Sequence, residues 1–545
     1  MKRTIWFLAF SFALIPALSA ANNWPPALGA DPKDPQNWPN DPGYGGQWNY
    51  WSFVRAPATQ TVRPQELALG SGFHADEAWQ TTIGDRRVLI AVLDSGIRWG
   101  SPDLVNKFYL NAGELPVPEA ACGVAPAGHD PHDANGDGIF NIQDYARPAP
   151  NDPTHLPVTP CDSRVHDTNG NGFIDPQDLI NIFSDHVDDD HNGYVDDISG
   201  WDMFEDDNDP NDDTDFGHGT GESHDSSAEG NNQRDSLGVC PECTVMMIRT
   251  GDSFVVDTAD FAMAVLYAVD RGANVVQEAL GSVDNSSLAQ AAINYAYAEN
   301  VTVIASAADE DSFHQNYPGS NQHTVYVHAI RYDSSSWQTA TTYLNFNNCT
   351  NYGGQLVLST PGTGCSSEAT GRTSGMAGLL YAAALQANIL PPRAAETDPQ
   401  GHRRLSGEEV KQLLVTTVDD INIPNYDPAT QYPSQPGWDQ RFGYGRPNIG
   451  RAVRQVAAGK IPPEVDIDRP YWFEVVYPDS SPCCPSARTS ASAPIATSHT
   501  IGRSSMRPGS SPPTPARTGI PSTPRPESLS PLAPRCRSRC GTSEA

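Results

Sequence analysis

The sequence predicts an α/β protein with a doubly wound parallel sheet. Residues 88–93 form an unbroken aliphatic run that ends at Asp94. Such a run is typical of a strand buried on both faces of a parallel sheet. From residue 238 onward, short apolar runs alternate with helical patterns, which indicates repeated βα units. Functional groups in such sheets gather at the carboxyl ends of the strands, so Asp94 is the first candidate site residue.

The composition bounds the size and the partners of the molecule. The 545 residues, 38% of them hydrophobic, allow one large domain plus extensions. The net charge is −32, and the stretch from Val165 to Gln233 contains neither Lys nor Arg. We therefore expect no nucleic-acid partner, because phosphate binding needs positive charge. The dense carboxylates suit either bound cations or a solvated acidic loop.

The first residues, 1–20, have the pattern of a secretory signal peptide. Lys2 and Arg3 precede a mostly apolar stretch, and small residues follow it. No later run reaches the ~18 apolar residues that a membrane span needs. We therefore expect a secreted protein, extracellular or periplasmic, that has no membrane span.

Export to such a compartment permits disulfide bonds. Cys122 and Cys161 bracket part of an acidic segment and are candidates for one bond, although connectivity does not follow from sequence. Cys240 and Cys243 form a single C-x-x-C pair, whereas a zinc site needs about four ligands. For this pair we expect a local disulfide or two loop thiols instead of a redox site.

The βα units after residue 238 can be bounded individually. Asp257 is a candidate N-cap for a helix in which Phe261 and Val265 share one face. Ser406 and Glu409 form a capping box at the start of another helix. The expected strands lie at 245–248, 275–281, 301–305 and 324–330, and the expected helices at 257–271, 287–299 and 406–418.

Residues 113–215 have the character of an insertion that carries two calcium-binding loops, 133–144 and 167–178. In both loops, oxygen-bearing side chains occur at positions 1, 3, 5, 9 and 12 around a Gly at position 6, which matches an EF-hand-type loop with a terminal Asp. The pair also resembles a dockerin repeat. The expected Ca²⁺ ligands, with position 7 acting through its carbonyl, are Asp133, Asn135, Asp137, Ile139, Asn141, Asp144, Asp167, Asn169, Asn171, Phe173, Asp175 and Asp178.

Residues 188–197 begin a third loop of this kind. Its position 12 is Ser199 and not an acid, so the calcium pattern is incomplete. The stretch resembles the Asp-rich segment that many bacterial subtilases carry before their active histidine.

Two further stretches carry candidate catalytic side chains. His218 lies in a glycine-flanked stretch, 216–221, and Ser367 lies among small residues in 365–371. With Asp94 they follow the chain order of subtilisin-type hydrolases. These stretches resemble the subtilisin family of serine peptidases, over roughly residues 40–457. The resemblance implies that Asp94 orients the imidazole of His218, which activates the hydroxyl of Ser367.

The nucleophile stretch follows the family pattern only in part. Relative to Ser367, the small residues Ala369 and Gly375 stand where the family has them, whereas Gly371 replaces a usual Pro and Cys365-Ser366 replaces Gly-Thr. Ser374 and Thr370 are rival nucleophiles. The bulky Arg372 would crowd Ser374, and the β-branch of Thr370 stiffens its χ1 angle, so Ser367 is the favoured assignment.

The residue expected to stabilise the oxyanion also departs from the pattern. The strand at 303–310 resembles the family strand that ends in Asn, but the matching residue here is Asp309. Loss of such a donor costs ~10²–10³ in turnover, and an ionised Asp would repel the developing oxyanion. One convertase branch of the family also carries Asp at this place.

The expected domain organisation follows from these boundaries. A subtilisin-like peptidase domain covers 21–457, a further β segment begins at 458–479, and a low-complexity tail covers 480–545. The tail is expected to be disordered. Its abrupt change from acidic to basic composition also raises the hypothesis of a frameshifted end, which resequencing would test.

The function that these observations predict is that of a secreted, calcium-binding serine endopeptidase acting on proteins or peptides. The alternative is a pseudoprotease, in which the same fold serves as a binding or surface module without activity. The altered residues around Ser367 and Asp309 are the reason for keeping both hypotheses.

Overall fold

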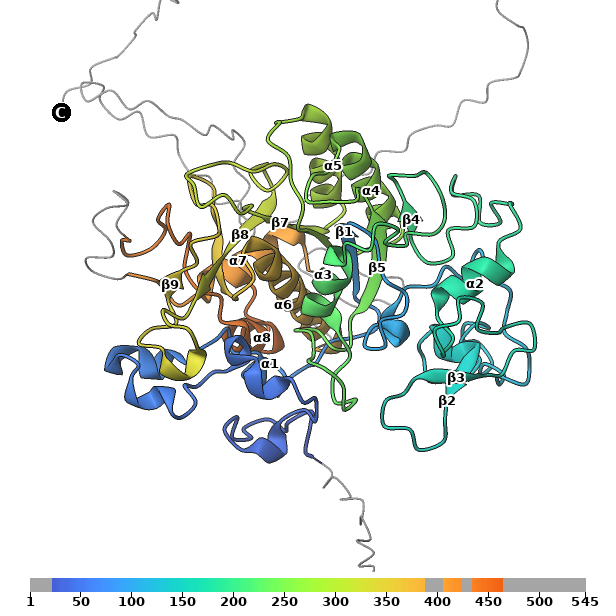
Figure 1. Cartoon of the computed structure of the whole chain (residues 1–545), viewed down its shortest axis with the longest axis horizontal. Coiled ribbons are helices and arrows are strands. Elements are labelled where there is room, and N and C mark those ends of the chain that lie inside the picture. The colour runs from blue at the N-terminus through green and yellow to red at the C-terminus, as the bar shows by residue number, and fades with distance from the viewer. Residues whose placement is uncertain (1–21, 388–404, 423–433, 464–545) are drawn as a thin grey trace, which may run out of the picture. The chain divides into compact units, whose positions relative to one another are not determined.

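The computed structural model describes residues 22–387, 405–422 and 434–463 (Figure 1). The predicted signal peptide at 1–20, the tail from 480 and residues 464–479 of the predicted β segment lie outside the described residues. The centre is an eight-stranded sheet of order β10-β8-β7-β6-β1-β5-β4, with β9 paired to β8. Only the β8–β9 pairing is antiparallel, which confirms the predicted α/β class. The strands are β1 Leu89–Asp94, β4 Trp201–Asp202, β5 Thr244–Arg249, β6 Val275–Glu278, β7 Thr302–Ser306, β8 Thr324–Arg331, β9 Asn345–Phe346 and β10 Leu358–Pro361.

Both faces of the sheet are covered, and β1 shows why its sequence is apolar throughout. Ile90 and Val92 belong to one core cluster, whereas Leu89, Ala91 and Leu93 belong to another. Helices α4 (Thr258–Asp270) and α5 (Ser287–Ala298) cover the second cluster (Figure 1). The first cluster is covered by α6 (Ser366–Gln386), α7 (Gly407–Thr416) and α8 (Ile449–Ala457). All six residues of β1 are therefore buried, as expected for a central parallel strand.

The helix boundaries follow the caps that the sequence predicts. The side chain of Asp257 accepts the amide of Ala259 at 2.7 Å at the start of α4. Ser406 and Glu409 form the expected capping box of α7. The remaining helices of the described chain are α1 Ala75–Ala78, α2 Pro176–Phe183, α3 His218–Ser227, α6 Ser366–Gln386, α7 Gly407–Thr416 and α8 Ile449–Ala457.

A row of glycines brings α6 unusually close to α3 and to the loop that follows it. A Cβ atom at Gly371 would lie 2.8 Å from Cβ of Asp225, and one at Gly375 would lie 2.6 Å from the carbonyl oxygen of Ser226. Both distances are shorter than a Cβ atom tolerates to any atom that is not bonded to it. Gly371, which replaces the usual Pro, therefore lets the two helices touch backbone to backbone.

The N-terminal segment, 22–84, packs through aromatic residues and short 3₁₀ helices instead of periodic elements. Tyr50 and Trp51 are fully buried, and the Tyr50 ring lies 4.9 Å from that of Phe73. The 3₁₀ helices of the described chain are η1 Pro35–Asn37, η2 Tyr44–Gly46, η3 Trp48–Tyr50, η4 Ala58–Gln60, η5 Pro64–Leu69, η6 Val105–Lys107, η7 Ile142–Asp144 and η8 Trp337–Thr339.

The acidic segment at 113–215 forms its own small structure beside the sheet (Figure 1). It contains an antiparallel pair, β2 Ala146–Pro148 and β3 Pro157–Pro160, and the helix α2. The sequence predicted that all of 113–215 is an insertion. In the structure, however, β4 near its end pairs with β5 and forms one edge of the central sheet.

Three disulfide bonds occur among the described residues. Cys122–Cys161 is the bond that the sequence suggested, and Cys240–Cys243 is the local alternative for the C-x-x-C pair. Cys349–Cys365 is new, and it lies immediately before the first residue of α6.

A membrane span was not expected, and in the described ranges no helix is long and apolar enough to form one.

Candidate active site

Three side chains from distant parts of the chain meet at the carboxyl edge of the sheet. Asp94 is the last residue of β1, His218 is the first residue of α3, and Ser367 is the second residue of α6. Gly217, at φ +81°, makes the left-handed turn that starts α3 and aims the His218 side chain back toward β1.

The three side chains form a continuous hydrogen-bonded chain. His218 Nδ1 lies 2.8 Å from Asp94 Oδ1, and His218 Nε2 lies 3.0 Å from Ser367 Oγ. Asp94 is fully buried, and its Oδ1 also accepts the amide of Ser95 at 2.7 Å. This arrangement can move a proton from a hydroxyl to an imidazole whose tautomer a carboxylate holds.

Two opposing effects act on the imidazole. Burial disfavours its charged form and lowers the pKa of His218, but the adjacent Asp94 carboxylate raises it. The net result is a pKa of His218 above its ordinary value. The histidine is thus suited to accept a proton and then to carry the positive charge during a reaction.

The rival nucleophiles are turned away from His218. Ser374 and Thr370 are both fully buried within α6. Ser374 Oγ donates to the carbonyl of Thr370 at 2.9 Å, and Thr370 Oγ1 donates to the carbonyl of Ser366 at 2.9 Å. These bonds lie inside the helix, whereas the hydroxyl of Ser367 reaches the histidine.

Asp309 lies beside the start of α6, just beyond the end of β7. Its Oδ1 accepts the backbone amide of Ser366 at 2.9 Å and the Ser366 hydroxyl at 2.5 Å. The hydroxyl of Ser306 bonds to the same Ser366 oxygen at 2.7 Å. Asp309 is exposed as a residue, yet desolvation of its carboxyl by neighbouring protein atoms raises the pKa of that group.

The family comparison agrees with this geometry. The family model described as "Subtilase family" matches residues 85–445. The chain belongs to the subtilase family.

Individual relatives are distant. A thermophilic serine proteinase of Bacillus sp. (strain AK1) is 29% identical over 259 residues, which are 47% of this chain and 56% of that protein. Thermitase of Thermoactinomyces vulgaris is 28% identical over 198 residues, 34% of this chain and 67% of that protein. The chain thus spans about half to two thirds of the length of these relatives. A solved protease structure from Pseudoalteromonas arctica PAMC 21717 has 19% identity and a TM-score of 0.41, covering 77% of this chain and 99% of that one.

The first two acidic loops of this subtilase share one backbone conformation. Gly136 and Gly138 in loop 133–144, and Gly170 and Gly172 in loop 167–178, all have positive φ. In each loop the first Asp accepts the amides of both glycines, at 2.6 to 3.0 Å. The calcium-loop pattern requires the turn at position 6, and the residue at position 4 has positive φ as well in both loops.

In the second loop the side chains at positions 3, 5 and 9 converge. Asn169 Nδ2 and Asn171 Nδ2 donate to Asp175 Oδ2 at 3.0 and 2.5 Å. Burial, with a smaller contribution from the charge of Asp178, raises the pKa of Asp175 to about 6. A cation at this point would relieve the desolvation of the carboxylate.

The acids at position 12 have a second role in both loops. Asp144 accepts the amides of Asn135 and Asn141 at 3.1 and 3.0 Å, and Asp178 accepts those of Thr168 and Asp175 at 2.6 and 3.0 Å. Each therefore closes the loop through backbone bonds and caps the short helix that follows. For Ile139 and Phe173, the backbone amides donate to the residue at position 5.

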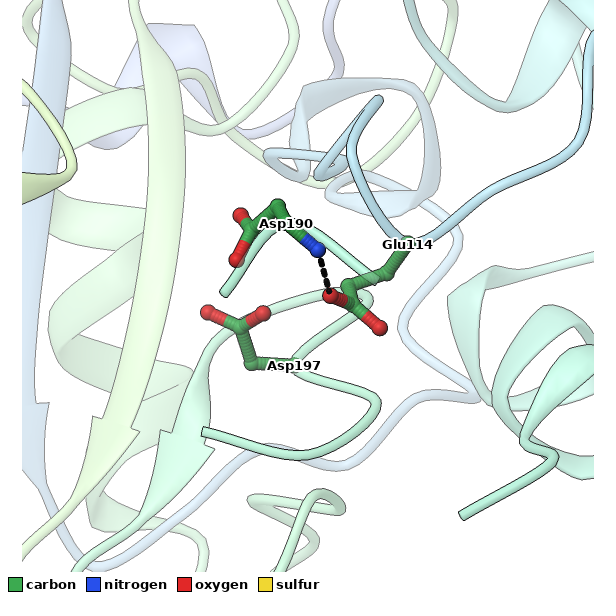
Figure 2. Close-up of side chains that lie close together, drawn as sticks. All are labelled: Glu114, Asp190 and Asp197. Carbon is green, nitrogen blue, oxygen red and sulfur yellow. Dashed lines mark hydrogen bonds between the residues drawn. The ribbon is translucent and has the colours of Figure 1, made fainter. Parts of the chain in front are cut away.

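The third loop contributes an acidic cluster that the sequence pattern did not predict in full (Figure 2). In Glu114, Asp190 and Asp197, one carboxylate oxygen each lies within 4.8 Å of the others. The amide of Asp190 donates to Glu114 Oε1 at 3.1 Å, so the loop folds onto residue 114. Arg271 lies 2.8 Å from Asp190 and supplies part of the balancing positive charge. Burial raises the pKa of Glu114 to about 6.

Proposed function

We propose that this subtilase is a serine endopeptidase that cleaves proteins or peptides, with Asp94, His218 and Ser367 as its catalytic residues. The observation that carries the proposal is the hydrogen-bonded chain from Asp94 through His218 to Ser367, with distances of 2.8 and 3.0 Å. The names of two relatives, a serine proteinase and thermitase, agree with it.

The reaction follows from the positions of the protons. His218 Nε2 accepts the proton of Ser367 as Oγ bonds to the peptide carbonyl carbon, and Asp94 stabilises the resulting imidazolium. The tetrahedral intermediate then expels the amine, which takes the proton from His218. A water molecule repeats the sequence on the ester and releases the acid, which restores Ser367.

The oxyanion needs a hydrogen-bond donor near Asp309, and only a protonated carboxyl can donate. An ionised Asp309 would instead face the developing negative charge with another one. In the proposed mechanism, the active form therefore carries a proton on Asp309 and none on His218.

Asp309 is also the observation that favours a second candidate function. If its carboxyl stays ionised, the same fold serves as a pseudoprotease that binds a peptide without cleaving it. The two candidates differ in their reaction with a fluorophosphonate. This reagent labels only an activated serine, which the peptidase has and the pseudoprotease lacks.

The test is a labelling series in calcium-containing buffer with wild type, Ser367→Ala, Ser374→Ala and Thr370→Ala. We expect a label in all variants except Ser367→Ala. Loss of the label only in another variant would move the nucleophile there. A folded wild type that takes no label would support the pseudoprotease.

We further propose that the protein is exported and binds Ca²⁺ in the loops at 133–144 and 167–178. The repeated positive-φ turns and the convergence of the Asn169 and Asn171 side chains on the Asp175 carboxylate support calcium binding. The three disulfides among the described residues support an oxidising compartment.

A further inference from the structure

The catalytic bond between His218 and Ser367 joins the first turns of two helices. His218 begins α3 and Ser367 lies in the first turn of α6, so a small shift between these helices changes the 3.0 Å distance between Nε2 and Oγ. Misplacement of a reacting group by ~1 Å can cost ~10²-fold in rate. The contacts that lock α3 against α6 therefore bear directly on the reaction.

A single buried guanidinium joins the two helices. Arg372 Nη2 lies 3.0 Å from Asp225 Oδ1 on α3 and 2.8 Å from Glu368 Oε1 on α6. Its Nε also donates to Glu368 Oε1 at 2.8 Å. The guanidinium carbon stands 5.0 Å from the centre of the buried Tyr50 ring, which favours a cation. Arg372 is 8% exposed, so water screens these interactions little.

Glu368 carries this connection to the residue beside the nucleophile. It directly follows Ser367, and its Oε2 accepts the backbone amide of Gly364 in the loop that leads into α6. Asn49 Nδ2 donates to Oε1 at 3.2 Å from the N-terminal segment. The carboxylate therefore fixes the chain on both sides of Ser367, and Arg372 holds that carboxylate in place.

The charges in this interface make the guanidinium necessary. Glu222, Asp225 and Glu368 all contribute carboxyl groups, and the electrostatic neighbours of Asp225 include Glu368 and Arg372. Burial raises the pKa of Asp225 to about 7 and also raises that of Glu222. Gln277 donates to Glu222 at 3.1 Å but brings no charge. Because Gly371 lets α6 lie directly against α3, removal of Arg372 would leave these acids close together without a balancing positive charge.

We propose that Arg372 is a positioning residue for catalysis, which aligns Ser367 with His218 by tying Glu368 on α6 to Asp225 on α3. This inference rests on the proposed peptidase function and assigns to Arg372 a role outside the reacting groups.

The experiment compares Arg372→Met with Arg446→Met. Arg446 is a second buried arginine, with no exposed surface. It pairs with Asp419 at 3.0 Å, and its side-chain hydrogen bonds go to residues 69, 70 and 419, outside both helices. Both variants should lower the melting temperature. In the folded fraction we expect kcat of Arg372→Met to fall by ~10²-fold with KM changed by no more than about twofold, and kcat of Arg446→Met to stay near wild type.

Nuclear magnetic resonance of ¹⁵N-labelled histidine gives a readout that does not need activity. The ring signals of His218 depend on its bonds to Asp94 and Ser367, so they should move in Arg372→Met and stay in place in Arg446→Met. Arg372→Lys keeps the charge but loses the planar fork, and we expect it to restore kcat in part.

Three outcomes separate the inference from the function on which it rests. Unchanged kcat and unchanged His218 signals in folded Arg372→Met would overturn the positioning role. An equal loss of kcat in Arg446→Met would also overturn it, because the effect would be one of general stability. A wild type that fails to cleave or take a label, but whose His218 signals respond only to Arg372→Met, would overturn the peptidase function and leave the alignment role standing.

Discussion

At the scale of single residues, the proposed mechanism needs His218 and Asp309 in opposite protonation states. Peptide attack requires neutral His218, whose pKa is raised, and oxyanion binding requires a protonated Asp309, whose pKa is also raised. Activity is lost below the pKa of His218 because the base is protonated, and above the pKa of Asp309 because the donor is ionised. Where the carboxyl is the stronger acid, only a small fraction of molecules is active at any pH.

Asp309→Asn should remove this conflict, since the amide donates at every pH. We expect kcat/KM to rise by ~10²-fold at neutral pH and the alkaline loss of activity to disappear, while the acid limb set by His218 stays. A pH profile of both proteins checks this. An activity that falls in Asp309→Asn would show that the carboxyl has another role.

The sequence predicted which three side chains gather, because Asp94, His218 and Ser367 each lie in a short recognisable stretch. It did not predict the contacts that hold these side chains in place. From the sequence, Arg372 was expected only to crowd Ser374, whereas in the structure it pairs with Asp225 from another helix. Such a pairing depends on how two helices pack, and neither local pattern contains that information.

At the scale of elements, the acidic loops predict a stability that depends on calcium. Asp133→Ala with Asp137→Ala should lower the melting temperature in calcium, because a ligand that binds only the native state stabilises it, by ~2.7 kcal/mol at a hundred times its Kd. Asp133 also accepts two backbone amides, so part of the loss will persist in chelator. The difference between the two buffers measures the calcium contribution.

Asp284→Ala provides the matched control, because Asp284 is an exposed acid outside the loops. It should leave the calcium dependence as in wild type. If chelator does not move the melting temperature of wild type, the calcium assignment fails.

Strand and helix positions were largely predictable, since capping residues and apolar runs are local signals, as at Asp257 and β1. The acidic cluster of Glu114, Asp190 and Asp197 could not be predicted from such local signals. Asp190 and Asp197 lie in a visible loop, but Glu114 is 76 residues away from Asp190 and joins through a turn with no distinctive pattern. The packed aromatic segment before residue 84 was likewise invisible to periodicity.

At the scale of the whole molecule, buried acids predict how stability changes with pH. Burial raises the pKa of Asp76 and of Asp103 to about 7. The native state therefore holds protons that the unfolded state, with ordinary pKa values near 4, has released. Their contribution is fully present below pH ~4 and is lost as the pH rises toward 7, at up to ~1.4 kcal/mol per pH unit for each group.

In chelator, we expect thermal unfolding to show higher stability near pH 5 than near pH 8. Asp76→Asn keeps the shape and removes one titrating group, so the slope between these values should become shallower. A slope equal to that of wild type would mean that Asp76 is not protonated in the native state. The net charge of −32 adds repulsion in the same direction.

Under the proposed export, the Cys349–Cys365 bond forms beside the proposed nucleophile only after the chain has reached an oxidising compartment. Protein prepared with reduced cysteines should take a fluorophosphonate label slowly and gain reactivity on oxidation by glutathione disulfide. The double variant Cys349→Ser with Cys365→Ser should show no gain of reactivity on the same oxidation. Equal labelling of reduced and oxidised wild type would contradict this. Because the cross-link comes only two residues before Ser367, the newly made chain would stay harmless to its producer until it reaches an oxidising environment.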